Sequence, residues 1–160
     1  MKTKIALFIA CVAAALALLL WLAGWPGEEE ESESEAGIAD LLLPVSACDP
    51  GITTCALDMP GGGRLTVDFS ARPPRALYPF TARITLETAE EVRAARLDLS
   101  GAEMDMGVIS HELVRDAEGH YQGEIVLPIC ITGVMRWQAD VIVEYDNERV
   151  IAPFLFSNGR

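Results

Sequence analysis

Apolar and polar residues alternate along most of the chain after residue 40, with a period of two. The alternation is seen in six runs: residues 64–70, 81–87, 96–100, 121–127, 135–145 and 150–156. A period of two is typical of a β-strand that buries one face. In the longest run, the face predicted to be buried carries Met135, Trp137, Ala139, Val141, Val143 and Tyr145. The pattern therefore predicts an all-β fold.

Turn-forming residues separate these runs, at 60–63, 89–91, 118–119 and 146–147. Six or seven short strands with one polar face are typical of an immunoglobulin-like antiparallel β-sandwich. We predict such a domain, with about seven strands, over residues 41–160. Only residues 88–95 have a sequence that could form a helical turn.

The N-terminal pattern is different, because residues 5–25 are a run of 21 residues without a charge. At 1.5 Å per residue this run spans a hydrocarbon core of about 30 Å. Lys2 and Lys4 precede it and acidic residues follow it, which predicts a cytoplasmic N-terminus by the positive-inside rule. We therefore predict a transmembrane anchor over residues 1–25. A cleaved signal peptide is the alternative, but its apolar region would be shorter.

Residues 26–40 begin with the sequence PGEEEESESEAG and are predicted to be an acidic, flexible tether. The formal net charge of the chain is -12, while residues 41–160 hold 10 arginines and 17 acids. The folded part is therefore only moderately acidic. No lysine follows Lys4, so the chain lacks the cationic face that nucleic-acid binding requires.

Three cysteines lie in the part predicted to be external: Cys48, Cys55 and Cys130. Cysteines in an oxidising compartment are expected to pair. The short segment CDPGITTC can close easily, which makes Cys48–Cys55 the first choice; Cys48–Cys130 and Cys55–Cys130 stay open. Cys11, inside the predicted anchor, is expected to be an inert apolar residue.

Met104 and Met106 are the candidate metal ligands. In a strand, residues i and i+2 project from one face, so we expect the two thioethers to lie together. Thioether sulfur is a soft ligand that selects Cu(I). His111 could add an imidazole and Cys130 a thiolate, if it is free, and Met59 is either a further ligand or part of the core. The competing interpretation is that the methionines fill the core.

Three segments carry a resemblance to a known family: EMDMG (103–107), GHYQGEIVLP (119–128) and GVMRW (133–137). They resemble the FixH/YtkA-like periplasmic domain family, with Met104 and Met106 in place of its Met-x-Met element. Asp105 stands where such motifs often have proline. The resemblance implies a single-pass protein of the bacterial inner membrane with a periplasmic domain.

The same resemblance implies an accessory role in respiratory copper handling, around assembly of haem–copper cytochrome oxidase. The partners would be a respiratory membrane complex or a copper-delivery protein, and the cofactor Cu(I). The sequence has no nucleophile elbow, phosphate-binding glycine loop or zinc-spaced histidine pair, so we do not expect an enzyme. The alternative function is a metal-free interaction module that docks on a membrane complex by an edge strand or by the Met-bearing face.

Overall fold

The computed structural model describes Leu18 and residues 38–129 and 134–159. Residues 38–160 form one compact unit. Its described part contains no helix and nine strands, so the predicted all-β fold is confirmed, with two strands more than expected. The strands are β1 (Ala39–Leu42), β2 (Cys55–Asp58), β3 (Arg64–Phe69), β4 (Phe80–Glu87), β5 (Ala94–Gly101), β6 (Val108–Arg115), β7 (Tyr121–Ile125), β8 (Arg136–Glu144) and β9 (Glu148–Ser157).

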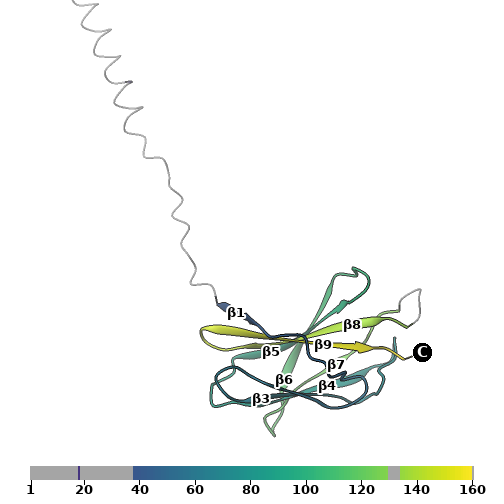
Figure 1. Ribbon diagram of the computed structural model, residues 1–160, viewed down its shortest axis with the longest axis horizontal. Coiled ribbons are helices and arrows are strands. Elements are labelled where there is room, and N and C mark those ends of the chain that lie inside the picture. The colour runs from purple at the N-terminus through teal and green to yellow at the C-terminus, as the bar shows by residue number, and fades with distance from the viewer. Residues whose placement is uncertain (1–17, 19–37, 130–133, 160) are drawn as a thin grey trace, which may run out of the picture. The chain divides into compact units, whose positions relative to one another are not determined.

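The nine strands form one curled sheet in the order β1-β9-β8-β5-β6-β7-β4-β3-β2. β1 pairs with β9 in parallel, and all other neighbours are antiparallel. β6 pairs with β5 from Val108 to Leu113, and with β7 only at Val114 and Arg115. The sheet therefore folds over at β6, and in Figure 1 β5, β8 and β9 lie in one layer while β3 and β4 lie in the other.

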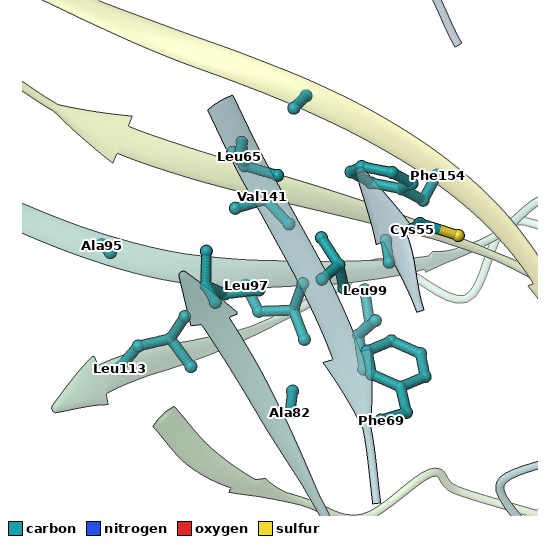
Figure 2. Close-up of a cluster of buried hydrophobic side chains, with 14 of the residues drawn as sticks. Cys55, Leu65, Phe69, Ala82, Ala95, Leu97, Leu99, Leu113, Val141 and Phe154 are labelled. Atoms are coloured by element: carbon teal, nitrogen blue, oxygen red, sulfur yellow. The ribbon is translucent and has the colours of Figure 1, made fainter. Parts of the chain in front are cut away.

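A single hydrophobic core fills the space between the two halves of the sheet. Figure 2 shows side chains of Leu65 from β3 and Leu97 from β5 in the same cluster. The ring of Phe69 meets Phe80 at 5.1 Å and Phe156 of β9 at 5.3 Å, edge to face. The six side chains predicted to be inward in residues 135–145 are all buried. The alternation therefore identified the core face of β8 correctly.

Three strands were not predicted: β1, β2 and β6. β1 and β2 have four residues each, too few for an alternating pattern to stand out. β6 lacks the usual alternation of apolar inner and polar outer residues. Val108 and Val114 on its outer face are 64% and 70% exposed, while His111 lies on its inner face with Leu113. The helical turn considered for residues 88–95 is not formed, since residues 88–93 are irregular and β5 begins at Ala94.

The predicted anchor, residues 1–25, lies outside the described residues except for Leu18, as does the part of the tether up to residue 37. No helix among the described residues is long and apolar enough to cross a membrane.

Two carboxylates oppose each other on the outer face of the sheet, because Asp98 of β5 is paired in register with Asp140 of β8. Arg96 donates from Nε to Asp98 at 3.2 Å, and Gln138 donates from Nε2 to Asp140 at 2.9 Å. Burial raises the pKa of Asp140, the hydrogen bonds from Gln138 lower it, and the Asp98 charge raises it further. The net effect is a pKa above the ordinary value of 3.8.

Asp140→Asn is expected to raise the free energy of unfolding at pH 7 by about 0.2–1 kcal/mol, because it removes like charges from directly opposed positions. The raised pKa means that the folded state binds the Asp140 proton more tightly than the unfolded state does. The resulting contribution to folding stability is fully present below pH 3.8, where Asp140 carries no charge, and it is lost as the pH rises through the folded-state pKa. The stability difference should therefore vanish in acid. Urea unfolding at several pH values measures it, with the exposed Glu124→Gln as control. An equal gain at all pH values would contradict the electrostatic origin.

Candidate functional site

The two candidate methionines lie in the loop that joins β5 to β6, residues 102–107, and not in a strand. The expectation that strand alternation places them on one face is therefore wrong. β5 ends at Gly101, and an Asx turn follows in which Asp105 Oδ1 accepts a hydrogen bond from the Gly107 backbone N–H at 3.0 Å. Gly107 has a φ of 74°, a left-handed conformation that favours glycine.

The loop gives the two thioethers different environments. Met104 is 44% exposed, whereas Met106 is partly buried and packs against the core. The pair therefore combines a side chain accessible from solvent with one held against the protein.

The structure places His111 on β6, apart from this loop. It is the fourth residue of the strand and is paired in register with Leu97. At 3.3 Å per residue its backbone lies about 13 Å along the strand from Gly107. Its Nε2 atom is buried without a hydrogen-bond partner among the described residues. His111 and the two methionines therefore come from separate positions and do not share one loop.

Cys48 and Cys55 form a disulfide bond, as predicted. The bond joins the segment after β1 to the first residue of β2, and Cys55 is almost completely buried. The two alternative pairings with Cys130 are therefore wrong. Cys130 itself, the fourth candidate ligand, lies outside the described residues, as does Cys11.

Met135 was predicted only as a core residue, but the structure brings it to the loop of residues 102–107. The Met135 Cε atom lies 3.0 Å from the point that a Cβ on Gly101 would occupy, and the carbonyl oxygen of Met104 lies closer still to that point. The Met135 backbone N–H donates to Asn158 Oδ1 at 2.8 Å. Met135 is therefore held beside the loop that carries Met104 and Met106.

Met59, the remaining methionine of the described residues, lies at the opposite end of β8. The Tyr145 hydroxyl, just after β8, donates to Met59 Sδ at 3.9 Å. β8 has nine residues and therefore spans about 30 Å between Met135 and Tyr145. Met59 is thus a core residue remote from the loop.

The sulfur atoms in the loop of residues 102–107 are donors that suit a soft cation. Among residues 38–129 and 134–159, no group of three or more His, Cys, Asp or Glu could hold a metal ion. The loop offers the thioethers of Met104 and Met106 together with the carboxylates of Glu103 and Asp105, and of these the thioethers are the donors that suit Cu(I) rather than Zn²⁺, Mg²⁺ or Ca²⁺. The residues present are therefore compatible with the copper chemistry that the resemblance implies.

A cleft of about 340 Å³ lies at the other end of the sheet, beside the irregular residues 88–93. Arg115 lies over the Tyr121 ring at 5.8 Å and forms one wall, while Glu90 and Glu91 form another. The Thr88 hydroxyl accepts from the Glu90 backbone N–H at 3.1 Å. This cleft is thus lined by charges of both signs, and the Thr88 hydroxyl in it already accepts a hydrogen bond within the turn of residues 88–90.

Comparison with known proteins yields no relative for this chain. No family model, no curated protein and no solved structure matches it.

Proposed function

We propose that this protein is a membrane-anchored periplasmic accessory protein that binds Cu(I) and assists assembly of a respiratory haem–copper oxidase. The main support for this proposal is the loop of residues 102–107, which carries the exposed thioether of Met104 and the partly buried thioether of Met106. In this proposal the N-terminal residues 1–25 are the transmembrane anchor, and the curled sheet is an immunoglobulin-like sandwich. The family resemblance supports the respiratory role.

The Cys48–Cys55 disulfide supports an extracytoplasmic location for the domain. Disulfide bonds persist in oxidising compartments such as the bacterial periplasm and are rare in the cytosol. The uncharged residues 5–25 with Lys2 and Lys4 before them support the same orientation. Thioether ligands are suited to this compartment, because they bind without deprotonation and form no disulfide.

The residues of the loop have separable roles in this function. The Asp105 carboxylate caps the turn through the Gly107 N–H and holds the loop between the two methionines. Met106 packs on the core and fixes one sulfur to the domain. Met104 is accessible and can pass the ion to a partner. Bound Cu(I) would be the cargo delivered to the oxidase.

Titration of the purified full-length protein with Cu(I), under reducing conditions and against a competing chelator, tests this proposal. We expect stoichiometric binding by the wild type and its loss in Met104→Leu/Met106→Leu, because the variant lacks both loop thioethers. Met59→Leu is the matched control and should bind as the wild type does. The proposal fails if the wild type takes up no Cu(I), or if the double variant binds equally well.

A metal-free interaction module is the second candidate function. It is favoured by exposed apolar side chains in and next to the loop: Met104 is 44% exposed, Val108 64% and Val134 43%. β1 and β2 are the two edges of the sheet and are the strands available for pairing with a partner. The same titration separates the two functions, since this module would bind no Cu(I).

A further inference from the structure

We infer that Met135 is a third thioether ligand of the Cu(I) site, an inference that rests on the proposed function. The site would then consist of Met104 and Met106 from the β5–β6 loop and Met135 from the start of β8. These residues are about 30 positions apart in the sequence, and the pairing of β5 with β8 brings them together.

The register explains how Met135 reaches the loop. Gly101, the last residue of β5, is paired with Trp137 of β8. The pairing continues by one further hydrogen bond, in which the Ala102 backbone N–H donates to the Arg136 carbonyl at 3.0 Å. The loop therefore leaves β5 alongside the residues that precede β8, and Met135 is the next residue in that direction.

Gly101 provides the space beside which the Met104 backbone and the Met135 side chain both lie. It has no side chain, so the Met104 carbonyl oxygen and the Met135 Cε atom both lie close to the point that a Cβ would occupy. Because any larger residue would collide with the Met104 backbone, the close approach depends on glycine at this position. The Met135 side chain is consequently directed at the base of the loop.

A third thioether suits the chemistry of the ion. Cu(I) accepts soft sulfur donors, and three neutral thioethers give it a set without any thiolate. Met135 is 5% exposed, so it would form the buried part of the site while Met104 remains the accessible part. The flexibility of methionine allows Met135 Sδ to turn toward the ion with little backbone change.

The test uses full-length protein labelled with ¹³C at the methionine methyl groups, titrated with Cu(I) under reducing conditions. We expect the methyl signals of Met104, Met106 and Met135 to shift together at one equivalent, while that of Met59 stays in place. Groups that only support metal ligands already change affinity by about 10–100-fold. Met135→Leu is therefore expected to weaken Cu(I) binding at least about tenfold, and Met59→Leu less than about twofold.

The outcomes separate this inference from the proposed function. If Met104 and Met106 shift while Met135 does not, or if folded Met135→Leu binds as the wild type does, Met135 is not a ligand and the two-methionine site stands. If no methyl signal shifts, both the inference and the proposed function fail. The wild-type spectra decide the question even if Met135→Leu does not fold.

Discussion

Phe69→Ala is expected to lower the free energy of unfolding by about 4 kcal/mol, within the range of about 3–5 kcal/mol for removal of a buried phenylalanine ring. Phe69 is 1% exposed and lies at the end of β3. It contacts Phe80 of the same half of the sheet and Phe156 of the opposite half. Its loss would therefore leave a cavity where the two halves meet. Urea unfolding of the full-length protein, followed by circular dichroism, measures the change.

Tyr78→Ala is the control for this prediction, because Tyr78 is 59% exposed and its ring is stacked under Arg75 at the surface. We expect that substitution to lower stability by less than about 1 kcal/mol, as is usual for exposed positions. Phe69→Leu should fall between the two, since leucine fills part of the cavity. An effect of Phe69→Ala as small as that of Tyr78→Ala would contradict the packing of the two halves around this ring.

The sequence predicted those strands whose one face is buried throughout. In β3 and β8 every second residue is apolar, so periodicity alone identified the strands and their inner faces. β6 was missed because it connects the two halves of the sheet and is largely exposed. Its exposed face carries the apolar Val108 and Val114, and its inner face carries the polar His111. This is the reverse of the usual pattern, in which apolar side chains lie inside and polar ones outside.

The geometry around the candidate methionines differs from the one that the sequence predicted. Met104 and Met106 were treated as strand residues, because their spacing of two fits a strand as well as a loop. The Asx turn at Asp105 decides between these, and it depends on a left-handed Gly107 that the pattern did not indicate. The position of Met135 depends on the pairing of β5 with β8, which are distant in sequence, and periodicity carries no information on such pairing.

The Cys48–Cys55 bond gives the second large expected effect. In the chain-entropy model, a bond that closes a loop of about eight residues stabilises the folded state by about 2.5 kcal/mol. The separation of the two cysteines is 7 residues. We therefore expect Cys48→Ala/Cys55→Ala to lower the free energy of unfolding by about that amount, measured by urea unfolding without reductant.

Reductant and Cys130→Ala provide the controls for this bond. Reductant should lower the stability of the wild type but leave that of Cys48→Ala/Cys55→Ala unchanged, since the double variant has no bond to reduce. Cys130→Ala should keep the full response to reductant, because Cys130 takes no part in the bond. Thiol labelling of denatured, unreduced protein should leave Cys48 and Cys55 unmodified. If Cys130→Ala abolishes the response to reductant, the bond instead involves Cys130, and the short loop before β2 is open.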